Sequence, residues 1–176
     1  MKNKIYLLII TIVLFFNDSI AQEYDGIISS SSLPNLEVRF ESCFNDGKLT
    51  TIIFSVKNTG NPFRMVNIGT RESYFENNPN CITHIVDDDG NSYIIRSVSL
   101  GEASFMPDSD TYPATISINL PANVWVKGRI GVLTRQSAKS FQKVNIGFLQ
   151  KNGSTFSGYC FSFKNVPIFY TDQAYE

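Results

Sequence analysis

The stretch LEVRFESCFNDGKLTTIIFSVKNTG, residues 36–60, decides the fold because it contains two alternating segments and a turn between them. Apolar residues at positions 36, 38 and 40 alternate with charged residues, which is typical of a strand with one buried and one exposed face. The turn NDG at positions 45–47 has residue types that tolerate positive φ. Residues 49–57 supply the partner strand, so the stretch predicts an antiparallel hairpin.

The rest of the chain repeats this pattern of short alternating segments separated by turn residues. Phenylalanine and tyrosine are abundant, and apolar residues seldom recur every three to four positions, so little helix is expected. The pattern predicts an all-β fold, an antiparallel immunoglobulin-like sandwich of about seven to nine strands, with a closed barrel as the second choice. Further strands are expected at residues 64–68, 81–86, 92–98, 115–120, 126–134, 141–149 and 159–164.

The first 21 residues have the features of a removable secretory signal peptide. Two lysines precede an apolar run, and small residues at positions 19 and 21 stand where a signal peptidase reads the chain. The run is shorter than the ~20 residues of a membrane-spanning helix, so no membrane insertion is expected. We therefore expect a secreted or periplasmic protein. Its expected parts are a signal peptide at 1–21, a flexible leader at 22–35, one sandwich domain at 36–171 and a tail at 172–176.

Five segments occur in a suggestive order: LEVRFESC, TTIIFSVKNTGN, IVDDDGNSYII, TISINLPANVWVKGRIGVL and FSFKNVPIF. With these, the chain resembles the uncharacterised immunoglobulin-like domains that Gram-negative gut-type bacteria secrete, over residues 36–169. The shared features are a strand ending in Asn-Thr-Gly, a D-x-x-G-N-x-Y hairpin and a strand entered through proline and then Lys-Gly. The resemblance implies an immunoglobulin-like fold and no catalytic residues, because most members have no known function. The polar stretch at residues 70–80 departs from the pattern as an elaborated loop.

Three consecutive aspartates beside a glycine and an asparagine allow two interpretations of residues 84–95. A helix-flanked calcium loop needs acidic residues, a glycine and a terminal glutamate at fixed offsets, and neither possible register fits. A polar hairpin tip with Gly90 at positive φ is therefore favoured. A weak, non-helical calcium site that uses Asp87, Asp89 and Asn91 stays open as the alternative.

Catalytic motifs are scarce in this sequence. Its one histidine, His84, lies inside a predicted strand, and no G-x-S-x-G, H-E-x-x-H or glycine-rich phosphate loop occurs. A serine triad through His84 and a pair of glycosidase carboxylates both stay open, but nothing singles out their members. We expect no catalytic residue, no metal and no cofactor. A hydrogen bond from His84 to a serine would favour the alternative, a hydrolase of extracellular polymers.

Three cysteines in an oxidising compartment predict one disulfide and one spare thiol. Cys43 and Cys160 fall on the polar phase of their predicted strands, whereas Cys81 lies at a junction between loop and strand. A bond between Cys43 and Cys81 is weakly preferred, because a loop adjusts readily to the ~5.5 Å Cα spacing that a disulfide requires. The other pairings stay open.

Charge is unevenly distributed along the chain. Residues 22–110 contain six basic and thirteen acidic residues, whereas residues 111–171 contain seven basic residues and no acidic one. If the strands expected at 126–134 and 141–149 form a hairpin, alternation places five cations on one outer face. These five cations are Lys127, Arg129, Arg135, Lys143 and Lys151.

Three interpretations of this cationic face are open. Outward acids of the first half, Glu37 and Glu41 among them, would neutralise it if they lie beside it. Alternatively, it would bind an acidic partner, such as an anionic glycan or an acidic protein. In the third interpretation the acidic half of one molecule meets the basic half of the next, which gives self-association. Nucleic acid fits poorly, because only Trp125 and Phe141 share the phase of the cations.

Tyr74 and Phe75 form a second candidate contact in the polar stretch. They would either stack on a sugar or partner, or close one end of the sandwich, and the second role is favoured. The sequence therefore predicts a secreted, non-catalytic binding or interaction module at the bacterial surface or in the periplasm. The alternatives are the hydrolase and a structural subunit of an extracellular assembly.

Overall fold

The structure, a computed structural model, describes residues 28–60, 63–69, 78–105, 115–152 and 155–171. Strands make up 69% of it, and the described residues contain no α-helix, which confirms the all-β prediction. Nowhere in this part of the chain is there a helix long and apolar enough to cross a membrane. The predicted signal peptide, the predicted tail, Tyr74 and Phe75 lie outside the described residues.

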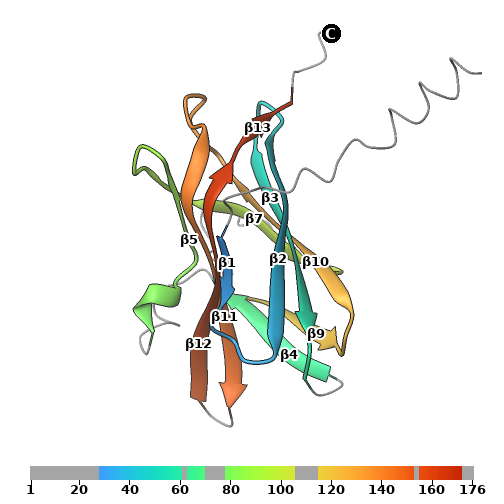
Figure 1. The fold of residues 1–176 in the computed structure, drawn as a ribbon. Helices are drawn as coiled ribbons and strands as arrows, with labels where there is room; N and C mark the ends of the chain where they lie inside the picture. Colours follow the sequence, from blue (N-terminus) through green and yellow to red (C-terminus); the bar gives the residue numbers. More distant parts are fainter. Residues whose placement is uncertain (1–27, 61–62, 70–77, 106–114, 153–154, 172–176) are drawn as a thin grey trace, which may run out of the picture.

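In the described part of the chain, thirteen strands, several of only two to four residues, form two sheets that face each other (Figure 1). The seven strands of the first sheet are β1 (Ile28–Ser31), β4 (Phe63–Gly69), β5 (His84–Asp87), β6 (Ser92–Tyr93), β9 (Thr115–Pro121), β11 (Ser140–Asn152) and β12 (Thr155–Pro167). Their order is β1-β12-β11-β4-β9, with β5 between β11 and β6 beside this path. The six strands of the second sheet are β2 (Leu36–Asn45), β3 (Thr50–Asn58), β7 (Ile95–Leu100), β8 (Ala103–Phe105), β10 (Trp125–Val132) and β13 (Phe169–Tyr170). Their order is β13-β2-β3-β10-β7-β8.

Phenylalanine rings fill the space between the two sheets. Phe54 of β3 is fully buried, and its ring centroid lies 6.4 Å from that of Phe161 and 6.2 Å from that of Phe163, both on β12. Phe40 of β2 meets Phe163 edge to face at 5.9 Å. Each fully buried ring stabilises the fold by roughly 1.5 to 3 kcal/mol relative to exposure. Contacts between rings of opposite sheets therefore hold the two layers together.

The hairpin predicted at residues 36–60 is confirmed. β2 and β3 pair antiparallel along almost their whole length. Gly47 turns the chain with a φ of 85°, and the Asp46 carboxylate accepts hydrogen bonds from two backbone N–H groups of the turn. The outward and inward residues alternate as expected up to Phe40.

A β-bulge in β2 reverses the phase of the strand beyond this point. The register shifts between Phe40 and Ser42, so Cys43 faces the core, where it is fully buried, and not the polar side as predicted. The preferred disulfide between Cys43 and Cys81 is wrong. Cys43 lies between the sheets, whereas Cys81 belongs to a separate apolar cluster on the outer side of the seven-stranded sheet.

β10 and β11 do not form the predicted hairpin. β10 lies between β3 and β7 in one sheet, and β11 lies between β12 and β4 in the other, so residues 133–139 cross between the sheets. The same topology interleaves the two halves of the chain, because β10 of the basic half is flanked by strands of the acidic half. Self-association stays a prediction, but the two halves of the chain do not form the separate acidic and basic faces that it requires.

The serine-rich leader contributes a strand to the first sheet. β1 pairs with β12 from Ile28 opposite Lys164 to Ser31 opposite Phe161, and Leu33 is 2% exposed in the core. The prediction of a flexible leader is therefore wrong for residues 28–35. Backbone hydrogen bonds at a sheet edge require no particular side chain, so a run of serines can complete it.

Candidate functional site

The outer face of the six-stranded sheet consists of rows, because opposed residues on neighbouring strands point the same way. Two rows near one end carry charged and aromatic side chains. The first row is Glu37, Lys57 and Trp125, and the second is Arg39, Ser55 and Lys127.

In the next two rows the side chains around one arginine are mostly small. One row is Ser42, Ile53, Arg129 and Ser99, extended by Ser104 of β8, and the other is Phe44, Thr51, Gly131 and Ser97. At Gly131 an added Cβ would collide with the side chains of Ser97 and Leu49. Small residues around a single long side chain leave a hollow in the face.

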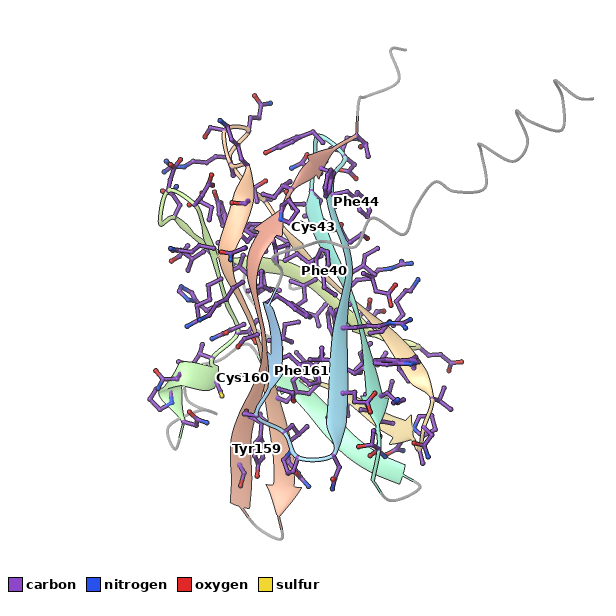
Figure 2. The ribbon with its side chains drawn as sticks, in the orientation of Figure 1. Phe40, Cys43, Phe44, Tyr159, Cys160 and Phe161 are labelled. Atoms are coloured by element: carbon purple, nitrogen blue, oxygen red, sulfur yellow. The ribbon has the colours of Figure 1, made fainter. Side chains whose placement is uncertain are left out.

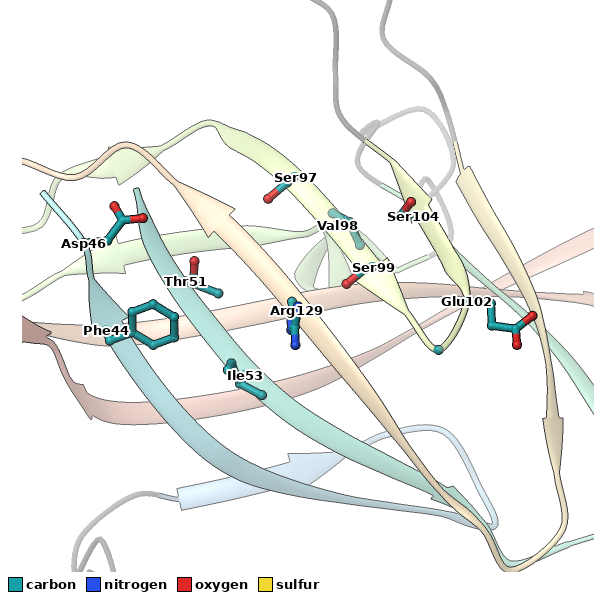
Figure 3. A pocket seen from close by; sticks show the side chains of 11 residues that line it. Phe44, Asp46, Thr51, Ile53, Ser97, Val98, Ser99, Glu102, Ser104 and Arg129 are labelled. Atoms are coloured by element: carbon teal, nitrogen blue, oxygen red, sulfur yellow. The ribbon is translucent and has the colours of Figure 1, made fainter. Parts of the chain in front are cut away.

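A shallow, open groove of about 700 Å³ lies over these two rows (Figure 3). Its volume falls in the range that is typical of small-molecule sites. Figure 3 shows Arg129 between Ile53 and Ser99, with Asp46 and Glu102 toward opposite ends of the groove. Four hydroxyl side chains line it, from Thr51, Ser97, Ser99 and Ser104. The groove therefore combines one cation with several groups that both donate and accept hydrogen bonds.

Among the described residues, Arg129 is the one cation that lines this groove. Its side chain is exposed, and within the part of the chain that the structure describes no carboxylate forms an ion pair with it. Asp46 is engaged in its own turn, where hydrogen bonds from the backbone N–H groups of Leu49 and Lys48 lower the pKa of its carboxyl. The guanidinium, with its five N–H donors, is therefore free to bind an anion.

At the charged end of the same face, two cations form ion pairs with neighbouring carboxylates. Arg39 Nε donates to Glu41 Oε1 at 2.8 Å, and Lys57 forms an ion pair with Glu37. Both cations also lie over the Trp125 ring, 4.4 and 4.9 Å from its centroid. Each exposed ion pair contributes only ~0 to 1 kcal/mol to stability, but the pairs occupy these cations.

Lys127 also belongs to this charged end. Burial of Glu41 acts to raise the pKa of its carboxyl. Hydrogen bonds from Ser55 and Arg39, together with the positive charge of Lys127, outweigh burial and lower that pKa. An acid of the first half thus lies beside a cation of the second half, as the neutralising interpretation expects at this position.

The five predicted cations do not share one surface. Lys127 and Arg129 point outward from the six-stranded sheet, whereas Lys143 points outward from the seven-stranded sheet on the other side of the sandwich. Arg135 lies in the connection between the sheets, and the side chain of Lys151 lies outside the described part. The predicted face is wrong as an assembly, because it required β10 and β11 to be neighbours. Anion binding by the individual residues stays a prediction.

Asp87 anchors the turn between β5 and β6, as the hairpin-tip interpretation requires, and Gly90 has a φ of 84°. The Asp87 carboxylate accepts hydrogen bonds from the backbone N–H groups of Asp89 and Asn91, the Asn91 side-chain amide and the Tyr93 hydroxyl. Its burial acts to raise its pKa, but the hydrogen bonds from Tyr93 and Asn91 outweigh this and lower the pKa. Asn91 directs its N–H groups, not its oxygen, at Asp87, so the alternative calcium site would require the turn to rearrange.

His84 makes a contact that bears on the hydrolase alternative. Its Nε2 atom lies 3.0 Å from the Oγ atom of Ser92, and a histidine beside a serine is the first requirement of a serine triad. Among the described residues no carboxylate bonds to the second ring nitrogen, the place that the acid of a triad occupies. The two residues also belong to the paired strands β5 and β6, so the contact additionally links these strands.

Comparison with known proteins found no matching family model, no matching curated protein and no matching solved structure. The assignment of a candidate site therefore depends on the geometry and chemistry of this chain.

The hydroxyl residues of the groove were not found from the sequence. Alternation within IRSVSL, residues 95–100, does place Ser97 and Ser99 on a polar phase. Only the pairing of β7 with β10, however, brings these serines beside Arg129. The sequence thus indicates that the two serines point outward. It does not indicate that they lie beside Arg129, because local patterns do not specify which strands pair.

Proposed function

We propose that this chain is a secreted or periplasmic, non-catalytic binding module that holds an anionic glycan in the groove around Arg129. The single observation that carries the proposal is an exposed arginine that pairs with no carboxylate of the described residues, in a hollow whose lining includes four hydroxyl groups. A guanidinium binds a carboxylate or sulfate through two parallel hydrogen bonds. Serine and threonine hydroxyls can exchange hydrogen bonds with the hydroxyls of a sugar ring.

The shape of the groove favours a glycan over an acidic protein. A protein partner needs a large contact area around an apolar centre, whereas this groove is small and open, and Arg129, two carboxylates and four hydroxyl groups are among the side chains that line it. Phe44 and Ile53 add apolar surface for the faces of a sugar ring. The ligand class that combines all these features is a uronic-acid or sulfated oligosaccharide.

We further propose that the chain is exported from the cytoplasm and that its two sheets form an immunoglobulin-like sandwich. The signal-like pattern of residues 1–21 supports export. Two facing, mainly antiparallel sheets support an immunoglobulin-like sandwich, together with the resemblance of the strand and turn motifs. Such a module would hold its ligand on a rigid sheet face rather than on loops.

A glycan array at two salt concentrations tests the proposal. We expect binding to uronic-acid or sulfated oligosaccharides, no binding to neutral ones of the same length, and weaker binding at higher salt. Binding that is equal for neutral and charged sugars, or absent for every anionic glycan, would rule the proposal out. Arg96 is an exposed arginine on the neighbouring strand β7 that does not line the groove, so Arg96→Ala is the matched control for Arg129→Ala.

The contact between His84 and Ser92 favours one second candidate, a hydrolase with Ser92 as the nucleophile. In this mechanism His84 would take the hydroxyl proton as Ser92 attacks a carbonyl carbon. Ser92 is exposed and His84 is only half-buried, which gives little exclusion of water, so the binding module remains the preferred proposal.

A further inference from the structure

Two of the three cysteines meet on the outer side of the seven-stranded sheet. Cys81 ends the single-turn 3-10 helix η2 (Pro79–Cys81) and is 3% exposed. It forms a small apolar cluster with Leu149 of β11, and Ile82 and Cys160 pack against that cluster. Figure 2 shows Cys160 on β12 beside this helical turn, well separated from Cys43.

A serine connects the two sulfurs. The Ser32 hydroxyl oxygen lies 3.8 Å from the Cys81 sulfur and 3.9 Å from the Cys160 sulfur. The backbone N–H of Cys160 donates to this same oxygen at 2.8 Å, and the backbone N–H of Ser32 donates to the Cys160 carbonyl at 3.0 Å. One oxygen therefore has both thiols within 4 Å, and its own position is fixed to the strand that carries Cys160.

The helical turn is itself held against the same strands. The Asn78 side-chain amide donates to the Gly158 carbonyl of β12 at 3.3 Å, and the Asn145 amide of β11 donates to the Asn80 carbonyl at 3.0 Å. Both bonds hold the residues just before Cys81 against β11 and β12. The structure has all three cysteines as free thiols, so a disulfide here requires the Cys81 and Cys160 sulfurs to move to bonding distance.

We propose that Cys81 and Cys160 are a disulfide pair that fastens the η2 turn to β12, and that Cys43 remains a buried thiol. Cys43 has no such neighbour, because it lies in the main core between the sheets. The pairing is independent of the groove and of its ligand.

The oxidant in this proposal is a small-molecule or protein disulfide. Cys160 is the more exposed thiol, so its thiolate attacks one sulfur of the donor, forms a mixed disulfide and releases the first donor thiol. The Cys81 sulfur then attacks the Cys160 sulfur, and the second donor thiol leaves with the Cys81 proton. The protein loses two electrons and two protons, which the donor gains as two thiols. Burial and the contact with Cys160 raise the pKa of the Cys81 thiol to about 12, which fits its role as the second thiol to react.

The test incubates the purified full-length chain with oxidised glutathione, blocks free thiols under denaturing conditions, and measures intact mass and a tryptic map. We expect one blocked thiol instead of three, and a linked pair of peptides 72–96 and 152–164, which contain Cys81 and Cys160. Peptide 40–48, which contains Cys43, should carry the blocking group. Three blocked thiols, or peptide 40–48 in any linkage, would overturn the proposal.

Three variants complete the experiment. Cys43→Ala should still form the linked peptides, whereas Cys81→Ser and Cys160→Ser should not. Because the bond closes a long loop, we expect the oxidised protein to melt roughly 5 to 15 °C above the reduced one. Cys81→Ser should not respond to reduction. An equal melting temperature for the oxidised and reduced forms of the wild type would contradict the proposed fastening of the turn.

Discussion

Arg129 on β10 lies directly opposite Ser99 on β7, and both side chains point outward from the six-stranded sheet. The serine leaves space beside the arginine that a larger residue would fill. Ile53 on the other neighbouring strand adds an apolar floor. The guanidinium therefore lies in a hollow that is open to solvent, and this hollow depends on the register of three strands that are distant in the sequence.

Asp87 should be essential to the stability of the β5–β6 turn. We expect Asp87→Ala to lower the free energy of unfolding by roughly 2 to 4 kcal/mol, because it leaves the Tyr93 hydroxyl and the turn N–H groups without their acceptor. Chemical denaturation measures this loss. Exposed Asp88 is the matched control, and Asp88→Ala should change stability by no more than about 0.5 kcal/mol. Equal effects of the two substitutions would contradict the anchoring role.

Much of the fold was predictable because strand alternation and turn residues are local signals. The hairpin of β2 and β3 follows from residues 36–60 alone. The bulge after Phe40 does not follow from these residues alone. Whether a strand accommodates one extra residue depends on the strand with which it pairs. The crossing of residues 133–139 between the sheets was missed for the same reason, since a polar connection of this length can close a hairpin or change sheets.

The candidate site was predictable only in part. Arg129 was selected correctly as an outward cation, because its strand alternates regularly. The residues around Arg129 were not predicted. Ser99, Ile53 and Gly131 lie near it only because their strands pair in this register. The aspartate turn was correctly favoured as a hairpin tip, because glycine at positive φ is a local requirement.

The stability that Asp87 contributes should decrease as pH falls into the acid range. Its pKa is lowered in the folded protein from an ordinary value of 3.8, so its contribution is present above about pH 4 and is lost as pH falls through the folded pKa. We expect the difference in unfolding free energy between the wild type and Asp87→Asn to be constant near neutral pH and to narrow in acid. A difference that narrows as pH rises would show that the pKa is raised instead.

Replacing Gly128 with a larger residue should lower the stability of the protein, because the Phe54 ring occupies the space beside it. A Cβ at position 128 would lie within 3.0 Å of three atoms of the Phe54 ring, inside the core. We expect Gly128→Ala to reduce the free energy of unfolding by about 1 to 3 kcal/mol, as overpacking does. Phe54→Leu should cost less in the Gly128→Ala background than in the wild type, which a double-mutant cycle measures. Additive effects of the two substitutions would contradict direct contact.

The His84–Ser92 contact should have no catalytic role if the chain is a binding module. We expect the purified protein to be unlabelled by a fluorophosphonate probe and to show no ester hydrolysis that Ser92→Ala removes. His84→Ala should leave glycan binding unchanged, because His84 lies on the other sheet from the groove. Labelling of Ser92 that disappears in His84→Ala would instead establish the hydrolase alternative.

The most direct test of the account is the affinity of a uronic-acid oligosaccharide for three forms of the protein, measured by isothermal titration calorimetry. The forms are the wild type, Arg129→Ala and the matched control Arg96→Ala. We predict that Arg129→Ala weakens binding at least about tenfold, which corresponds to about 1.4 kcal/mol, and that Arg96→Ala binds like the wild type. Equal affinity of the wild type and Arg129→Ala would contradict the proposed site.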